Sequence, residues 1–337
     1  MSSFKDLALD ISEKEYREID ALSYSLLSKF NKTGFSGLDK LYEKEESPAL
    51  TWGSLVDTLL TDKEHFDDKF VVVDLPKISD KIAEIVNDML DNEDTEIIED
   101  PIIIEYLNKH EYQPNWKDDT RLSKFKSLAN EYFVVLKEAK GKTIISTDDY
   151  QQAISCISKV REQFPMLTED PFEDVDIYCQ LKFKANLHGI DYKCMTDIVK
   201  VNHTDKTILI TDFKTSGYPE YEFYKAYIKW DYQLQARLYT RIIKEVISKS
   251  EKFRGYKVLP FRFIVVNKDT QTPLEWICKH CFSIGELKMG QYCDVVLKDP
   301  ETLGIELHDY LTNKPKVPND VKINEANDLN WFINNKM

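Results

Sequence analysis

The chain has few glycines and no long hydrophobic run, and both shortages exclude classes of protein. Only 10 of its 337 residues are glycine, and the absence of a glycine-rich phosphate-binding loop removes most nucleotide-driven motors and Rossmann enzymes. No segment approaches the roughly 18 to 20 consecutive apolar residues that span a membrane. The opening stretch, MSSFKDLALDISEKEY, lacks the basic and apolar regions of a signal peptide. We therefore expect a cytoplasmic, intracellular protein without a membrane partner.

Histidine and cysteine are present without a typical catalytic or metal-binding pattern. The six histidines form no H-E-x-x-H motif and no triad signature. Cys278-Lys-His-Cys281, followed by Cys293, has irregular spacing for a zinc ribbon or knuckle. In a chain of this length without an export signal, reduced thiols are favoured over a disulfide framework. The six cysteines are Cys156, Cys179, Cys194, Cys278, Cys281 and Cys293.

Positive charge is also in short supply. The sequence has 45 Lys and Arg against 59 Asp and Glu, a net charge of -14. This balance argues against general coating of nucleic acid and leaves room only for a local basic patch. It does not exclude a nucleic-acid enzyme, because such an enzyme can confine its Lys and Arg to a groove.

Hydrophobic periodicity divides the chain into a helical part and a strand-rich part. The spacing predicts helices over residues 24–30, 52–62, 79–90, 122–139 and 147–164, with Ser146 or Thr147 as the cap of the last. Three β-rich segments follow at 175–185, 191–201 and 206–213, then a long helix from about Glu220 to Ser248, a strand at 260–268 and a polar, more helical tail. The three strands, with their short connections, should pair antiparallel, and the later strand can join the same sheet. The fold class is α/β or α+β.

Three charged residues interrupt the apolar strands. Side chains alternate across a strand, so Asp197 should share a face with Met195, Val199 and Val201, and both Asp212 and Lys214 a face with Ile208 and Ile210. If Val201 pairs with Ile208, the carboxylates of Asp197 and Asp212 are directly opposed, with their Cβ atoms about 5 Å apart.

Two carboxylates at that distance repel and lose hydration, so something must compensate. A Mg²⁺ or Mn²⁺ ion would do so, because both prefer hard oxygen ligands. Lys214 would then orient water or stabilise phosphate charge. The ordinary alternative is an Asp212–Lys214 ion pair at a strand end with Asp197 near water, and the spacing leaves it open.

The long helix adds an independent observation. Tyr224, Ile228, Gln235, Tyr239, Ile242 and Val246 fall near one line at 100° per residue, which predicts the buried face. An unpartnered buried amide costs about 1 to 3 kcal/mol, so Gln235 should reach a polar site beneath the helix. A hydrogen bond from Gln235 to a tyrosine or to the backbone is the alternative.

Together these residues resemble the PD-(D/E)XK nuclease superfamily. Asp197 is similar to the first acid, Asp212-Phe213-Lys214 to the D-x-K triplet, and Gln235-Ala-Arg-Leu-Tyr239 to the Q-x-x-x-Y motif of the RecB-like branch. The resemblance implies a mixed central sheet flanked by helices, with a helical N-terminal region. Some relatives hold an iron–sulfur cluster, but Cys156 lies inside a predicted helix, and we do not expect a cluster here.

Within that branch, the chain resembles the exonuclease VIII or RecE-like phage recombination nucleases over about residues 20 to 268. The supporting segments are GKTIISTDDYQQAISCISKVREQFP and ALTWGSLVDTLLTD. The group has a G-x-x-x-H motif in the second segment, where this chain reads Gly53-Ser-Leu-Val-Asp57. Asp57 therefore stands where the group has a metal-binding histidine: its oxygen atoms could take the place of the histidine nitrogen, or the site could be weakened.

The resemblance implies hydrolysis of phosphodiester bonds in double-stranded DNA with Mg²⁺ or Mn²⁺. Asp57, Asp197, Asp212 and the Phe213 backbone carbonyl would bind metal, Lys214 would position water, and Gln235 and Tyr239 would support the phosphate or that water. Lys225 and Lys229 lie four residues apart on a helix flank, where they either contact the DNA backbone or are simply solvated.

Organisation and partners are also implied by the resemblance. We expect residues 1–170 to form a helical N-terminal region, 171–270 the catalytic core and 271–337 a C-terminal helical extension, packed as one compact domain. A bacterial or phage-encoded exonuclease that forms a homo-oligomeric ring and works with a single-strand annealing protein fits the group. The alternatives are a nuclease-fold module that binds DNA or protein without cleaving and a PD-(D/E)XK endonuclease.

Overall fold

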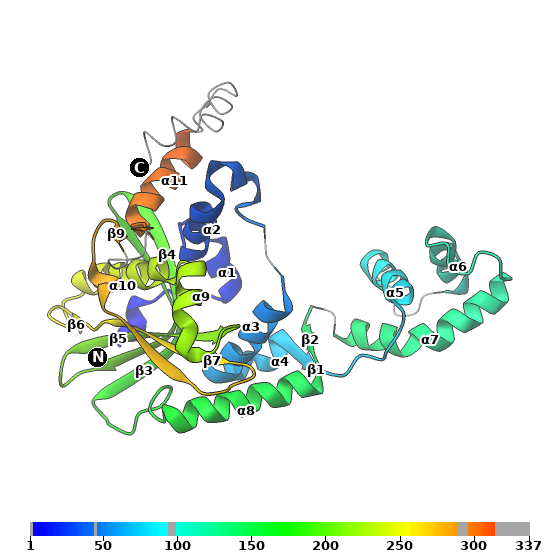
Figure 1. Ribbon diagram of the computed structural model, residues 1–337, viewed down its shortest axis with the longest axis horizontal. Coiled ribbons are helices and arrows are strands. Elements are labelled where there is room, and N and C mark those ends of the chain that lie inside the picture. The colour runs from blue at the N-terminus through cyan, green and yellow to red at the C-terminus, as the bar shows by residue number, and fades with distance from the viewer. Residues whose placement is uncertain (1–2, 44–45, 94–98, 140, 289–295, 314–337) are drawn as a thin grey trace.

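A mixed six-stranded sheet forms the centre of the molecule (Figure 1). The computed structural model describes residues 3–43, 46–93, 99–139, 141–288 and 296–313. The strand order is β3-β4-β5-β7-β8, with β6 also beside β5. The sheet strands are β3 (Val175–Leu187), β4 (Ile190–Asn202), β5 (Thr207–Ser216), β6 (Lys257–Val258), β7 (Phe261–Asn267) and β8 (Leu274–Cys278).

The pairing confirms the predicted meander and the later strand. Strands β3, β4 and β5 are antiparallel neighbours, and β7 joins parallel to β5. His188 and Gly189 both have positive φ, which is the geometry of a two-residue hairpin turn that matches strand twist. The sheet is therefore mixed, and the predicted α/β class is confirmed.

Helices cover both faces of the sheet. Helix α10 (Tyr232–Ser248) packs its apolar side against Val199, Val201 and Ile210. Helices α3 (Pro48–Thr61) and α8 (Thr147–Gln163) bury theirs with Ile198 and Phe213 on the other face. Ser146 caps α8 as predicted, since its hydroxyl accepts a hydrogen bond from the Asp149 amide at 3.1 Å. The sheet thus lies between two hydrophobic cores.

The remaining elements surround this sandwich or leave it. The other helices are α1 (Glu13–Glu18), α2 (Tyr24–Thr33), α4 (Phe66–Lys69), α5 (Asp80–Asn92), α6 (Asp100–Lys109), α7 (Asp118–Glu138), α9 (Phe223–Lys229) and α11 (Pro300–Asn313). Short strands pair as β1 (Phe70–Val72) with β2 (Thr143–Ile145) and β9 (Leu287–Lys288) with β10 (Val296–Leu297). No helix among the residues described here is both long and apolar enough to cross a bilayer.

Helices α5, α6 and α7 form an arm that projects from the body, and the β1–β2 pair lies at its base (Figure 1). The arm has its own core, which includes Ile85, Leu107 and Phe125 and is separate from the two cores of the sheet. Helix α6 is not among the helices predicted from the sequence. The proposed division at residues 170 and 270 stays a prediction.

The predicted single helix from Glu220 to Ser248 is wrong. Helix α9 ends at Lys229, and α10 begins at Tyr232 after Asp231, whose φ is +54°. The break is held from α2, because the Tyr24 hydroxyl donates to the Trp230 carbonyl at 2.5 Å and Ser28 donates to the same oxygen. Tyr224 consequently belongs to α9 and is 49% exposed, so its predicted burial is also wrong.

The expectation of a helical tail after residue 270 is also only partly right. Strand β8 follows β7 as an antiparallel neighbour at the edge of the sheet, and α11 comes later. The alternation of apolar residues in Leu274–Cys278 is short and includes Glu275, which pairs with Arg262 on β7. Pairing with a preformed strand therefore decides a conformation that five residues alone do not specify.

The predicted alternation of the β4 side chains between the two faces of the sheet does not hold along the whole strand, because it is interrupted between Cys194 and Val199. Cys194 and Val199 both face the α10 side although they are five residues apart. On β3, Gln180 has a φ of +54°, and the regular pairing with β4 is interrupted between Cys179 and Leu181, opposite Asp197. Both strands change faces there, so Met195 lies on the opposite face from Val199, contrary to the prediction.

Candidate active site

The candidate site lies where β4 and β5 separate. Val201 pairs with Ile208, as predicted, and the regular pairing ends at Ile198 and Thr211. Beyond this point β5 continues beside β7 only. Asp197 occupies the fork, and one of its carboxylate oxygens accepts a hydrogen bond from the Phe213 amide at 2.8 Å. The strand geometry thus brings an acidic side chain into the gap next to Asp212.

Asp212 is almost completely buried and is held by two neighbours. Lys214 Nζ lies 2.6 Å from its Oδ2, and Gln235 Nε2 donates to its Oδ1 at 2.5 Å. The prediction that Gln235 reaches a polar site beneath the helix is therefore confirmed. The amide nitrogen must face the carboxylate because a carboxylate accepts hydrogen bonds. Its oxygen, Oε1, is buried and has no hydrogen-bond partner within the described part of the chain.

Asp57 approaches the same region from α3. Its Oδ1 accepts from Thr61 Oγ1 at 3.2 Å, and its Oδ2 accepts from Gln180 Nε2 at 3.1 Å. Gln180 also donates to Thr61 Oγ1 at 2.8 Å. Sequence reasoning missed Gln180 and Thr61, although a polar residue in the middle of an apolar strand would have drawn attention to Gln180.

A glycine brings α3 close to β5. A Cβ atom on Gly53 would lie 3.0 Å from Thr215 Oγ1, closer than most side-chain contacts. Thr215 directly follows Lys214, so α3 packs closely against the strand that carries the D-x-K triplet at this point. The glycine of the predicted G-x-x-x-D motif therefore has a packing reason.

The electrostatics of the site disfavour several simultaneous negative charges. Burial raises the pKa of Asp57 to about 6; Lys214 opposes this shift and Asp212 adds to it. Burial, followed by the charges of Asp212 and Asp57, raises the pKa of Asp197 well above its usual value. For Lys214, burial favours the neutral form, but Asp212 and other neighbours outweigh it and raise the pKa above normal. The three carboxylates and the lysine thus interact electrically, and the lysine remains charged.

The oxygen atoms suit a hard divalent cation, but they are not assembled around one point. Within the described ranges, no group of three or more His, Cys, Asp or Glu side chains converges closely enough to hold a metal ion. Asp212 is instead occupied by Lys214 and Gln235. The donor chemistry therefore fits Mg²⁺ or Mn²⁺, whereas the arrangement shown is that of an ion-paired site.

Two tyrosines of α10 border the site. Tyr239 lies one turn after Gln235 and is buried; burial raises its pKa well above normal, with smaller contributions from residues that include Asp212. Tyr232, which the sequence prediction did not select, has its ring centre 5.1 Å from Lys214 Nζ. An aromatic face over a lysine stabilises the cation.

The two predicted DNA-backbone lysines lie apart from the carboxylates, on α9. Lys225 forms an ion pair with Glu222 at 2.7 Å. Lys229 Nζ lies 4.9 Å from the ring centre of Trp230, at the end of the helix. The structure therefore brings Lys229 beside an aromatic side chain that the sequence prediction did not select.

The cysteine motif is packed inside the body. Cys278 and Cys281 are both buried, and the Tyr227 hydroxyl lies 3.3 Å from Cys278 Sγ and 2.7 Å from His280 Nε2. Burial raises the pKa of the Cys278 thiol to about 11, which favours the neutral thiol. Cys293, the third member of the proposed cluster, lies outside the described residues.

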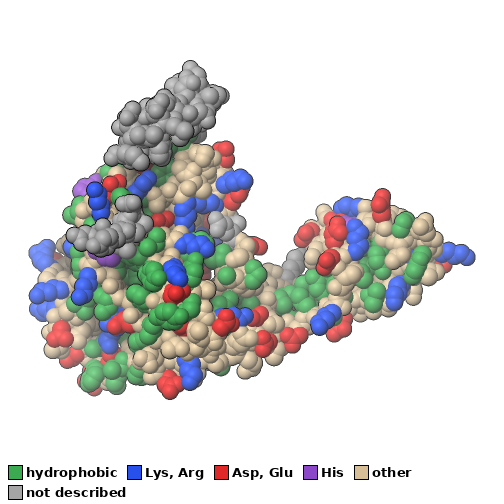
Figure 2. Space-filling model, in the orientation of Figure 1, with side chains coloured by type: hydrophobic (Ala, Val, Ile, Leu, Met, Phe, Trp, Pro, Cys, Tyr) green, Lys and Arg blue, Asp and Glu red, His purple; other side chains and the backbone are tan. Residues whose placement is uncertain are grey.

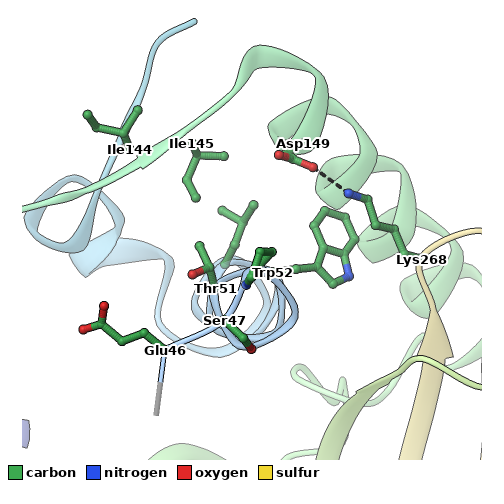
Figure 3. A pocket seen from close by; sticks show the side chains of 10 residues that line it. Glu46, Ser47, Thr51, Trp52, Ile144, Ile145, Asp149 and Lys268 are labelled. Atoms are coloured by element: carbon green, nitrogen blue, oxygen red, sulfur yellow. Dashed lines mark hydrogen bonds and ion pairs between the residues drawn. The ribbon is translucent and has the colours of Figure 1, made fainter. Parts of the chain in front are cut away.

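A pocket of about 440 Å³ is lined by residues other than the candidate site residues (Figure 3). It is bordered by the start of α3, strand β2 and the start of α8, and includes Thr51, Trp52 and Ile145. Lys268 forms an ion pair with Asp149 at 2.6 Å and lies over the Trp52 ring. None of the predicted catalytic or metal-binding residues lines this pocket.

Comparison with known proteins gives distant structural neighbours and one family. A solved structure from Eubacterium rectale, described as a candidate exonuclease, is 17% identical, with 91% of this chain and 85% of that chain covered and a TM-score of 0.39. A second, the protein SSO0001, is 10% identical, with 71% and 86% covered and a TM-score of 0.22. No curated protein matches the sequence.

The family is shown by the sequence itself, over most of its length. Residues 23–296 match the family model described as a PDDEXK-like domain of unknown function. That range contains the strand fork, the D-x-K triplet and the whole of α3 and α10. The chain therefore belongs to the PDDEXK-like family DUF3799, whose name denotes a nuclease-like fold.

Proposed function

We propose that this chain is a metal-dependent deoxyribonuclease that hydrolyses phosphodiester bonds from the ends of double-stranded DNA. The observation that carries the proposal is the electrostatic coupling of the buried carboxylates of Asp57, Asp197 and Asp212 with Lys214 around the fork between β4 and β5. Membership of a PDDEXK-like family supports the same reaction class.

Asp57, Asp197, Asp212 and the Phe213 carbonyl would hold Mg²⁺ or Mn²⁺. When bound, such an ion lowers the pKa of water and offsets charge that develops on the phosphate. The raised pKa values of Asp57 and Asp197 support this assignment, because a cation would offset both the burial, which is the larger cause, and the repulsion that raise them. All four donors are oxygen atoms, which these two ions prefer.

The protein groups around the carboxylates have separate tasks in this proposal. Lys214 carries a retained positive charge, which can orient the attacking water or stabilise the phosphate. Gln235 Oε1, an unpartnered acceptor within the described residues, can accept a hydrogen bond from that water but not from a fully ionised phosphate. Tyr239 would support the same region from one turn further along α10.

The sequence resemblance adds four further parts to the proposal. They are attack from DNA ends, a role in phage-type recombination, a homo-oligomeric ring and a single-strand annealing partner. An intracellular location in bacteria, with a bacterial or phage gene, goes with that role. A ring would explain end dependence physically, because a closed protein ring must be threaded by a free end.

The test compares linear and covalently closed circular double-stranded DNA with Mg²⁺ or Mn²⁺. We expect the wild type to degrade only linear DNA, and Asp212→Asn to lose at least about 100-fold in rate, because its metal and water environment is altered. Asp191→Asn is the matched control, since Asp191 is also a strand aspartate paired with a lysine, but at the β3–β4 hairpin. Cutting of the closed circle would indicate an endonuclease instead.

A second candidate is a nuclease-fold module that binds DNA or protein without cleaving. Two features favour this candidate: Asp212 is ion-paired with Lys214, and position 57 holds an aspartate in place of the histidine of the resembling group. If neither DNA is degraded with either metal while DNA binding persists, the catalytic proposal fails and this candidate replaces it. An Asp57→His variant that gains cleavage would then identify residue 57 as the cause.

A further inference from the structure

Trp230 is an exposed aromatic residue between two lysines. It is 41% exposed, at the break between α9 and α10. Lys32 Nζ from α2 lies 4.5 Å from its ring centre, and Lys229 Nζ lies 4.9 Å away. Figure 2 shows Lys and Arg side chains interleaved with hydrophobic ones on the face over these helices. In a chain of net charge -14, such a cluster is a local exception.

A short chain of contacts connects this tryptophan to the candidate active site. The Trp230 carbonyl accepts from the Tyr24 hydroxyl, and the Tyr24 ring centre is 6.3 Å from that of Tyr232. The Tyr232 ring in turn lies 5.1 Å from Lys214 Nζ, and Lys214 pairs with Asp212. The α9–α10 break is therefore anchored beside the site through Tyr24 and Tyr232.

We propose that Trp230 is a stacking platform for an unpaired base of the DNA strand that enters the site, with Lys229 placed for an adjacent phosphate. This inference rests on the proposed function and adds its substrate contact: an end with unpaired nucleotides, recognised independently of sequence. Aromatic faces bind any base in this way, whereas lysines bind the backbone.

The energies permit a base to replace a lysine on the ring. An exposed cation–π contact contributes about 0.5 to 1 kcal/mol, while base stacking on an aromatic side chain contributes about 1 to 3 kcal/mol. The displaced ammonium group keeps its charge and lies next to the incoming phosphate. Stacking is thus favoured over the contacts seen without DNA.

The two carboxylates closest in sequence to Lys229 have hydrogen-bond or ion-pair partners of their own. Asp231 is turned toward α2, where its oxygens accept from Ser28 and Asn31. Glu222 is paired with Lys225. The positive charge of Lys229 thus remains beside the indole ring.

The test measures DNA binding by proteins that also carry Asp212→Asn, so that cleavage does not interfere. Fluorescence anisotropy compares a blunt duplex, the same duplex with a short single-stranded overhang, and that overhang with abasic nucleotides. We expect Trp230→Ala to weaken binding of the normal overhang by roughly 5- to 150-fold. It should scarcely change binding of the abasic overhang, and Trp230→Phe should restore most of the affinity.

Trp116→Ala is the matched control, because Trp116 is 44% exposed but precedes α7 in the arm. Lys229→Gln gives an independent readout, a decrease of about 0.7 in the slope of log affinity against log salt for one lost single-strand phosphate contact. Equal affinities of Trp230→Ala and Trp116→Ala for the normal overhang, or no DNA binding at all, would overturn the inference. If the wild type does not cleave DNA but Trp230→Ala still binds the normal overhang more weakly than Trp116→Ala does, only the proposed nuclease function would be overturned.

Discussion

Asp57 and Asp197 are each harder to ionise than an ordinary aspartate, because burial and neighbouring carboxylates oppose the charged form. Metal binding needs both groups deprotonated, so protons and metal compete for the same oxygens. Lys214 supplies only one positive charge against three carboxylates. The site is therefore short of positive charge near neutral pH and should respond strongly to a divalent cation.

This competition predicts a pH-dependent stabilisation by metal. The pKa of Asp57 in the fold, about 6, lies above its unfolded value, so its contribution to stability is present at low pH and is lost as pH rises through about 6. Without metal, the melting temperature should fall between pH 5 and pH 8, and the increase caused by Mg²⁺ should grow over the same range. Thermal melts of wild type and Asp57→Asn at each pH measure this. An increase caused by Mg²⁺ that is the same at both pH values would contradict the assignment.

Gln180 is a positioning residue for Asp57. Its backbone is in a conformation that non-glycine residues rarely adopt, and its amide reaches both Asp57 and Thr61. Such backbone conformations persist only where surrounding contacts hold them. The interruption of the β3–β4 pairing therefore serves to direct one side chain toward α3.

Replacing Gln180 with Ala should weaken metal binding roughly 10- to 100-fold, since partners that hold a metal ligand have effects of this size. The metal concentration that gives half-maximal nuclease activity should rise, with a smaller effect on the maximal rate at saturating metal. Gln152→Ala is a suitable control, because Gln152 donates to Asp148 on the outer side of α8. A fall in maximal rate with unchanged metal dependence would contradict a positioning role.

Among the elements, the approach of α3 to β5 determines where Asp57 lies. Gly53 leaves only enough room for the Thr215 hydroxyl. The same helix buries Leu55, Val56 and Leu59 on the sheet. A larger side chain at position 53 would therefore move the helix, and with it Asp57, while the apolar face still packs.

Gly53→Val should reduce kcat/KM by roughly 10- to 100-fold, because a displacement of about 1 Å at a catalytic group has effects of this order. DNA cleavage rates at saturating metal provide the measurement. Gly217→Val is the control: Gly217 is close in sequence to Lys214, its φ is not positive, and a Cβ atom there meets nothing within 4 Å. Equal activity of the two variants would show that the close approach is not needed.

At the scale of the whole molecule, the arm and the body are built differently. The segment from residue 80 to 138 contains 15 acidic and 7 basic residues, so its net charge of -8 is more than half of the total. Figure 1 shows the arm extending away from the sheet. Acidic charge disfavours contact with DNA, so the body, and not the arm, is the DNA-binding part in our proposal.

The separate core of the arm predicts that it unfolds on its own. Leu107 is fully buried among arm residues, and Leu107→Ala should cost about 2 to 5 kcal/mol. Hydrogen exchange should then accelerate in α5, α6 and α7 while β4 and α10 stay protected. Leu234→Ala in α10, which is equally buried in the body, is the control and should affect the sheet instead. Simultaneous loss of protection in arm and sheet by Leu107→Ala would show one cooperative unit.

The sequence alone determined the elements with strong periodicity and the residues that interrupt it. Asp197, Asp212, Lys214 and Gln235 could be selected because a charge or amide on an apolar face has a desolvation cost that needs a partner. The Val201–Ile208 register, assumed for the short turn between the two strands, is the one that the structure shows. These are local properties, carried by residues close together along the chain.

Only the tertiary structure decided the helix break at Asp231, the change of faces at Gln180, the contact of Gln180 with Asp57 and the separate arm. Each depends on residues distant in sequence: the break is held by hydrogen bonds from α2, and the contact joins β3 to α3. Local propensity cannot encode these contacts, because the free energy that stabilises them comes from packing and hydrogen bonds that exist only after the chain has folded.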